Sequence, residues 1–140
     1  MRKVKWAKLP DALKPNIAAS SKIFDNPEQE LLFQIQAAGL PEPRRNYQFF
    51  HDRKWKADFA WIDQNILVEI EGGIWTRGRH VRGVGYTNDC EKYNMAQSMG
   101  WKVYRFTPEH VRKGAALLFL ERELIVEGNR VNVTKKDSLI

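Results

Sequence analysis

Residues 55–73 read WKADFAWIDQNILVEIEGG, and this stretch decides the expected fold. It contains two runs rich in aromatic and β-branched residues, 55–61 and 66–71, which are typical of strands. The intervening DQN at 63–65 is a favourable turn sequence. We therefore expect a β-hairpin at the centre of the chain.

Three carboxylates stand out in this hairpin. Asp58 lies within the first strand, whereas Glu69 and Glu71 are two residues apart in the second and therefore point to one face. Burying unpaired carboxylates is unfavourable, and a hard divalent cation such as Mg²⁺ or Mn²⁺ removes that penalty together with their mutual repulsion. An exposed polar face, on which these acids pair with Lys54 and Lys56, is an equally consistent interpretation.

The flanking segments predict the other elements. A helix over 26–39 begins with a capping Asn and a Pro and ends at a Gly. A strand is expected over 47–51. A second helix is expected to begin near Asn88, which forms a capping box with Glu91, and to end at Gly100.

The C-terminal part of the chain predicts one more strand and one more helix. Residues 101–106, WKVYRF, alternate polar and apolar side chains and indicate a strand. A third helix begins at 107–109 and continues to 127–128. The expected order is α-β-β-β-α-β-α, which indicates an α/β fold with a mixed β-sheet flanked by helices.

The composition is that of a globular protein. The 140 residues are 43% hydrophobic and 29% charged, and no apolar run approaches the roughly 18 residues of a membrane span. The N-terminal residues lack the apolar stretch of a secretory signal, and a single cysteine, Cys90, excludes an internal disulfide. We therefore expect a cytoplasmic protein that does not bind membranes, in the host cytoplasm if the protein is phage-encoded.

The positive charge is concentrated near the N-terminus. The net charge is +6, and residues 1–25 hold six basic residues against two acidic ones. Such an arm suits a polyanionic partner such as DNA, although a solvated tail explains it equally well. We expect three regions: a basic arm over 1–25, one folded domain over 26–128 and a polar tail over 129–140.

Taken together, several motifs resemble the PD-(D/E)xK, or restriction-endonuclease-like, nuclease superfamily. The motifs are WKADFAW, LVEIEGG, GRH and DCEKYNMAQSMGWKVYRF, and the resemblance covers residues 26–112. Within the superfamily the sequence is most similar to the very-short-patch-repair-like branch and to small phage and bacterial endonucleases related to it. Two positions depart from the pattern: Ala57 replaces the Pro before the first Asp, and Glu71 replaces the usual Lys.

The resemblance implies a metal-dependent endonuclease that hydrolyses phosphodiester bonds in duplex or branched DNA. Asp58 and Glu69 would hold Mg²⁺ or Mn²⁺, with Glu71 either ligating the metal or orienting the attacking water. Lys56 and Lys92 are candidates for contacting the charged phosphate, although solvated surface positions explain each lysine by itself. The replacement of Lys by Glu71 leaves the general base open, and a non-catalytic nucleic-acid-binding protein on the same fold is the alternative.

The loop after the carboxylates is rich in arginine and glycine. Arg77, Arg79 and Arg82 are expected to bind DNA phosphates. His80 is a candidate proton donor, with a simple phosphate contact as the alternative. Asp89 has either a site role or a helix-capping one. Cutting both strands would require a dimer or two successive nicks, and the sequence does not fix the oligomeric state.

The first helix contributes one further candidate. On a helical wheel Glu28 lies at the angle of Leu32 and Ile35, whereas Glu30 faces the opposite way. The resemblance implies a fourth carboxylate on this helix, so Glu28 is a candidate catalytic residue. Its position in the first turn, where the helix dipole favours acids, is the structural alternative.

Overall fold

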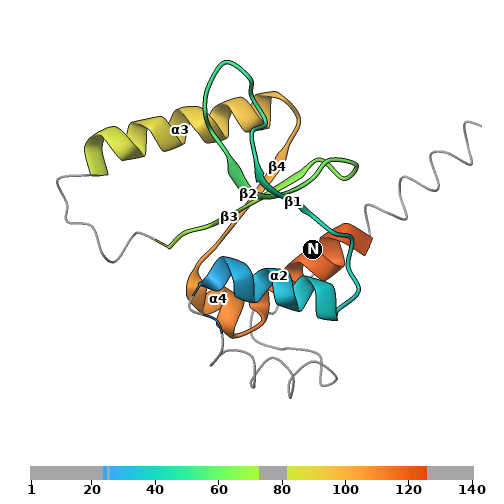
Figure 1. The fold of residues 1–140 in the computed structure, drawn as a ribbon. Coiled ribbons are helices and arrows are strands. Elements are labelled where there is room, and N and C mark those ends of the chain that lie inside the picture. The colour runs from blue at the N-terminus through green and yellow to red at the C-terminus, as the bar shows by residue number, and fades with distance from the viewer. Residues whose placement is uncertain (1–23, 25, 73–81, 126–140) are drawn as a thin grey trace, which may run out of the picture. The chain divides into compact units, whose positions relative to one another are not determined.

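The computed structural model describes residues 24, 26–72 and 82–125, which belong to two compact units. The sheet unit comprises residues 43–108, and the helix unit comprises the described residues up to 42 and from 109. Each unit is coloured by residue number in Figure 1. In these described ranges, no helix combines the length and apolar character needed to cross a membrane.

The sheet unit contains a four-stranded mixed sheet and one long helix. The strands lie in the order β1-β2-β3-β4; the first two pairs are antiparallel and the last is parallel. Their bounds are β1 Arg44–Tyr47, β2 Ala57–Trp61, β3 Ile66–Ile70 and β4 Lys102–Phe106, and helix α3 spans Arg82–Ser98. The predicted element order and the mixed sheet are therefore confirmed.

The strand register separates the two faces of the sheet. Ala60 pairs with Leu67, and Leu67 pairs with Val103 of β4. These side chains pack with Ala96 of α3 in one core cluster, so this is the α3 face of the sheet. The opposite face carries Phe59, Ile66 and Val68, all fully buried. Because side chains alternate along a strand, Glu69, two residues after Leu67, lies on the α3 face.

The expected hairpin is confirmed, but its neighbouring strand was placed too late. The turn over 62–65 includes Asn65 at φ +57° and joins β2 to β3. The first strand ends at Tyr47 rather than beginning there. The aromatic run after Tyr47 is not a strand: Phe49 and Phe50 stack against Trp55 in the loop before β2. Their apolar character reflects packing in this loop.

Helix α3 begins at Arg82, six residues before the predicted start at Asn88. Asn88 does not cap the helix, because its Oδ1 accepts hydrogen bonds from Trp55 Nε1 at 3.1 Å and from Arg53 Nη2 at 3.0 Å. Glu91, the expected second member of the capping box, forms an ion pair with Arg53 at 3.1 Å instead. Both polar residues thus join the helix to the β1–β2 loop.

The helix unit begins with α2, Pro27–Ala37. Asn26 caps it as predicted, with its side chain accepting a 2.8 Å hydrogen bond from the Glu28 amide, and Gly39 follows at φ +68°. The predicted third helix is interrupted: α4 spans Pro108–Arg112, and a second helical stretch covers 115–125. Gly114, at φ +78°, ends the first piece because only glycine adopts this conformation freely.

The expected orientation of α2 is wrong. Its buried stripe comprises Glu30, Leu31, Gln34 and Ile35, whereas Glu28 is only partly buried. Gln34 is tolerated there because its Nε2 donates to the Val111 carbonyl at 3.0 Å. Burial raises the pKa of Glu30, and Arg112 partly offsets this effect. A wheel drawn from apolar residues alone misplaces a helix that buries two polar side chains.

Two glycines, Gly85 within α3 and Gly100 just after it, test where this helix begins and ends. Gly85 lies within the helix and has open space around its Cα, so Gly85→Ala should raise the free energy of unfolding by about 0.5 kcal/mol. Gly100 has φ +92°, so Gly100→Ala should lower it by roughly 1 kcal/mol. Urea unfolding of both variants measures these two changes in the free energy of unfolding. A neutral Gly85→Ala would mean that the helix begins near Asn88.

Candidate active site

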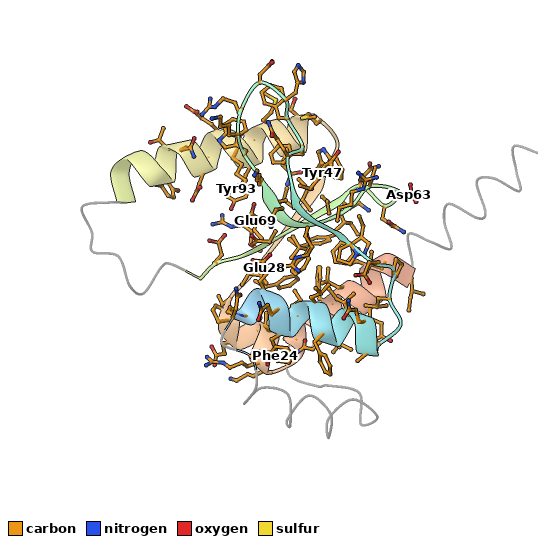
Figure 2. All side chains as sticks on the ribbon, in the orientation of Figure 1. Phe24, Glu28, Tyr47, Asp63, Glu69 and Tyr93 are labelled. Atoms are coloured by element: carbon orange, nitrogen blue, oxygen red, sulfur yellow. The ribbon has the colours of Figure 1, made fainter. Side chains whose placement is uncertain are left out.

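The predicted carboxylates lie on the α3 face of the sheet, at the end far from the hairpin turn. Glu69 is two residues after Leu67 and so shares the face that packs on α3, and Asp58 lies close enough to raise the pKa of Glu69 by charge repulsion. Glu71 follows directly after β3 and its amide donates to the Phe106 carbonyl at 2.8 Å. Figure 2 shows Glu69 beside Tyr93 of α3 and Asp63 at the distant turn.

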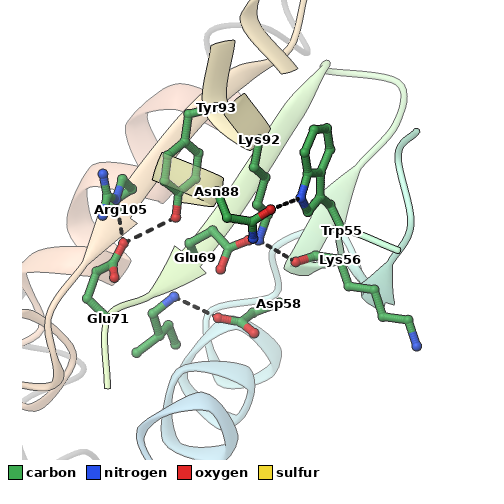
Figure 3. Close-up of polar contacts among 10 residues, drawn as sticks. Trp55, Lys56, Asp58, Glu69, Glu71, Asn88, Lys92, Tyr93 and Arg105 are labelled. Atoms are coloured by element: carbon green, nitrogen blue, oxygen red, sulfur yellow. Dashed lines mark hydrogen bonds and ion pairs between the residues drawn. The ribbon is translucent and has the colours of Figure 1, made fainter. Parts of the chain in front are cut away.

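Asp58 closes the gap between β2 and β3 beyond their last paired residues. The backbone pairing of the two strands ends at Phe59 and Val68. One step further on, Asp58 Oδ2 accepts a 2.7 Å hydrogen bond from the Ile70 amide (Figure 3). The side chain replaces a missing backbone partner and is fixed in position by it.

Glu69 forms an ion pair with Lys92 of α3. Both side chains are only 13% exposed, so the pair is largely removed from water. Lys92 Nζ also donates to the Lys56 carbonyl at 2.7 Å (Figure 3). A single ammonium group thus joins the helix to β3 and to the residue just before β2.

The electrostatic environment of Glu69 disfavours its negative charge. Burial is the largest effect and raises its pKa to about 7, while Lys92 opposes the rise. Asp58 and Glu71 add to it by charge repulsion. Even with its lysine partner, this carboxylate is therefore stabilised by a proton or by additional positive charge near pH 7.

Glu71 forms an ion pair with Arg105 Nε and accepts a weaker 3.4 Å hydrogen bond from the Tyr93 hydroxyl. The Arg105 guanidinium lies 4.3 Å from the centre of the Tyr93 ring. Burial is the main reason that the pKa of Tyr93 is raised, and Glu69 and Glu71 contribute. Tyr93 therefore remains a neutral hydrogen-bond donor near pH 7. Figure 3 shows these three side chains beside the Glu69 pair.

The other predicted residues differ in how they relate to this cluster. The Lys56 side chain is exposed and points away from the carboxylates, and only its carbonyl takes part (Figure 3). Glu28 belongs to the helix unit, and its role stays a prediction. Arg82 is the first residue of α3. Arg77, Arg79, His80 and most of the basic arm and the polar tail lie outside the described residues.

The sequence interpretation missed two members of the cluster, Tyr93 and Arg105. Neither residue was among the candidates, and Arg105 occupies one of the polar positions of the alternating strand expected over 101–106. Pairing β4 in parallel with β3 places Arg105 beside Glu69 and on its face. The sequence signal for Arg105 was its polar position in a strand expected to join the sheet that carries the acids.

A second group of polar and aromatic side chains lies elsewhere in the sheet unit. A hollow of about 680 Å³ is lined by residues of the 50–55 segment and of α3. Arg53 lies in its wall, 4.1 Å from the centre of the Trp55 ring, and forms the ion pair with Glu91. Arg53 thus has the same types of contact as Arg105 but is not part of the carboxylate cluster.

The carboxylate cluster fits a divalent cation in its chemistry. Among residues 24, 26–72 and 82–125, no group of three or more His, Cys, Asp or Glu side chains is arranged to hold a metal ion. Asp58 and Glu69 nevertheless supply hard oxygen atoms, and the raised pKa of Glu69 reflects unfavourable negative charge that a cation would relieve. Glu71 is held by Arg105 and Tyr93 in this arrangement.

The raised pKa of Glu69 predicts a specific pH dependence of stability. Between pH 4.5 and 7 the folded chain retains a proton that the unfolded chain has released, so Glu69 makes folding less favourable as pH rises through this window. Glu69→Gln removes this titration. The free energy of unfolding of the variant, relative to that of the wild type, should increase by about 2 kcal/mol from pH 4.5 to pH 7.5.

Urea unfolding at a series of pH values measures this difference. Glu109→Gln is the matched control, because Lys113 lowers the pKa of Glu109 and its titration therefore lies below the window. Its stability relative to the wild type should stay constant between pH 5 and 7.5. A constant difference for Glu69→Gln as well would contradict the burial of this carboxylate.

The chain was compared with family models, curated proteins and solved structures. No family model, curated protein or solved structure matches this chain.

Proposed function

We propose that the protein is a metal-dependent DNA endonuclease with a restriction-endonuclease-like core. The observation that carries the proposal is that Asp58 lies close enough to Glu69 to raise its pKa by charge repulsion, while Lys92 forms an ion pair with Glu69. A purely structural polar face would be exposed and balanced, whereas the Glu69 side chain is only 13% exposed and has a raised pKa. Retaining such an unfavourable arrangement is typical of functional sites.

Asp58 and Glu69 are the proposed holders of Mg²⁺ or Mn²⁺, with Glu71 as a third ligand or a water-orienting group. When bound, such an ion supplies a Lewis acid for the phosphate and lowers the pKa of water. Asp58 is already fixed by the Ile70 amide, which limits the ordering required of it. Tyr93 and Arg105 hold Glu71 at the edge of the cluster.

Lys92 is the proposed cation of the site, and the general base stays open. Its ammonium group contacts Glu69 and is held by the Lys56 carbonyl, so it is oriented before substrate arrives. A positioned ammonium group stabilises negative charge that develops on a phosphate, and it does so better in a partly buried site. The Lys56 carbonyl accepts the hydrogen bond from Lys92, and the exposed Lys56 side chain is proposed to contact a more distant phosphate.

DNA binding would draw on positive charge outside this cluster. The net charge is +6, and the basic arm together with Arg77, Arg79 and Arg82 supplies cations suited to phosphates. His80 stays a candidate proton donor in the same loop. The alternative function is nucleic-acid binding without catalysis, which the Glu69–Lys92 ion pair favours because the pair partly neutralises the carboxylate without a metal.

Cleavage of supercoiled plasmid in Mg²⁺, Mn²⁺ or EDTA separates the two functions. Asp58→Asn and Glu69→Gln should each abolish metal-dependent cleavage while DNA binding is retained or strengthened, because each change removes a negative charge that repels phosphate. Wild-type cleavage by either variant would remove that residue from the catalytic site. Binding by the wild type with no cleavage in either metal would support the non-catalytic alternative.

Lys92→Gln and Lys56→Gln provide a matched pair of lysine variants. Lys92→Gln should lower the single-turnover cleavage rate by about 10²-fold, because it removes the ammonium group beside Glu69. Lys56→Gln should cut at close to the wild-type rate, since it keeps the backbone carbonyl that holds Lys92. Equal rates for the two variants would show that Lys92 serves only to join α3 to the sheet.

A further inference from the structure

Arg105 is held rigidly at the edge of the carboxylate cluster. Its Nε donates to Glu71, and its guanidinium plane lies over the Tyr93 ring. Arg105 is also the β4 register partner of Glu69, so its backbone position is fixed by the parallel pairing. Two side-chain contacts and one backbone constraint therefore determine where the guanidinium lies.

These contacts use only part of its hydrogen-bonding capacity. A guanidinium has five N–H donors, and Glu71 engages the single donor on Nε. Within the described part of the chain, neither Nη nitrogen has a hydrogen-bond partner, and the side chain is 46% exposed. The Nη1–Nη2 edge is thus a fixed pair of donors that faces away from its carboxylate partner.

This arrangement differs from that of a structural ion pair. An arginine that serves only to neutralise a carboxylate gains most from a two-bond contact, in which two nitrogens face two oxygens. Here a single nitrogen contacts Glu71, and the aromatic ring holds the plane in place of a second bond. The remaining edge matches the spacing of two oxygens on a phosphate.

We propose that Arg105 binds a backbone phosphate of the nucleic acid next to the carboxylate cluster, with Glu71 and Tyr93 as the residues that position it. The inference rests on the proposed function and adds a substrate contact outside the arginine-rich loop and the basic arm. Because the guanidinium is already ordered, little side-chain entropy is lost when it binds a phosphate.

Arg53 provides a matched control within the same unit. It also forms an ion pair with a glutamate, lies over an aromatic ring and is 44% exposed. Its Nη2 donates both to Glu91 and to Asn88, and it lies in the wall of the hollow. Removing either arginine lowers the net charge equally, so any difference between them reports position.

The experiment measures binding of a fluorescent 20-base-pair duplex in EDTA at several KCl concentrations. Arg105→Gln should weaken binding about 5- to 10-fold and reduce the slope of log K against log salt by about one unit. Arg105→Lys should keep the slope, because the charge remains, but lose affinity because the paired donors are gone. Arg53→Gln should leave both quantities unchanged.

Equal effects of Arg105→Gln and Arg53→Gln, or an unchanged slope for Arg105→Gln, would overturn the inference. If Arg105→Gln unfolds, Arg105→Lys retains a cation for Glu71, and wild-type affinity in that variant would overturn it instead. Plasmid cleavage by the wild type is scored separately. Cleavage without an Arg105 effect rejects this inference alone, whereas an Arg105 effect without cleavage in Mg²⁺ or Mn²⁺ rejects the endonuclease proposal alone.

Discussion

The ion pair between Lys92 and Glu69 is the constraint on which the rest of the site depends. Both side chains are largely removed from water, and breaking such a pair would leave an uncompensated buried charge. The pair fixes the rotation of α3 over the sheet, because Lys92 must also reach the Lys56 carbonyl. Tyr93, the next residue of the helix, is thereby directed toward Glu71.

Local sequence signals predicted the elements whose contacts are also local. The β2–β3 hairpin follows from two apolar runs and a DQN turn, and the start of α2 follows from Asn26 and Pro27. The start of α3 was missed because Asn88 and Glu91 have the pattern of a cap but bind Trp55 and Arg53. A polar side chain near a helix start has two possible partners, and only the tertiary structure decides between them.

The same distinction explains how much of the site the sequence predicted. Strand alternation correctly placed Glu69 on one face, and the hairpin placed Asp58 near it. Arg105 was missed because its position depends on the parallel register between β3 and β4, which joins segments more than 30 residues apart. Glu30 was placed on the wrong side of α2, because a helical wheel of apolar residues gives no information about tertiary packing. The burial of Glu30 depends on that packing.

The carboxylate cluster is more acidic than the chain as a whole. Asp58 and Glu71 each repel Glu69, and Asp89 acts on Tyr93 and Arg105 as a fourth acid. Two cations, Lys92 and Arg105, oppose these four acids, although the whole chain has a net charge of +6. A polyanion brought to this face therefore meets local repulsion. The Nη edge of Arg105 and the basic residues elsewhere oppose that repulsion during binding, whereas a divalent cation between the carboxylates would serve catalysis, so binding and any catalysis at this face depend on different charges.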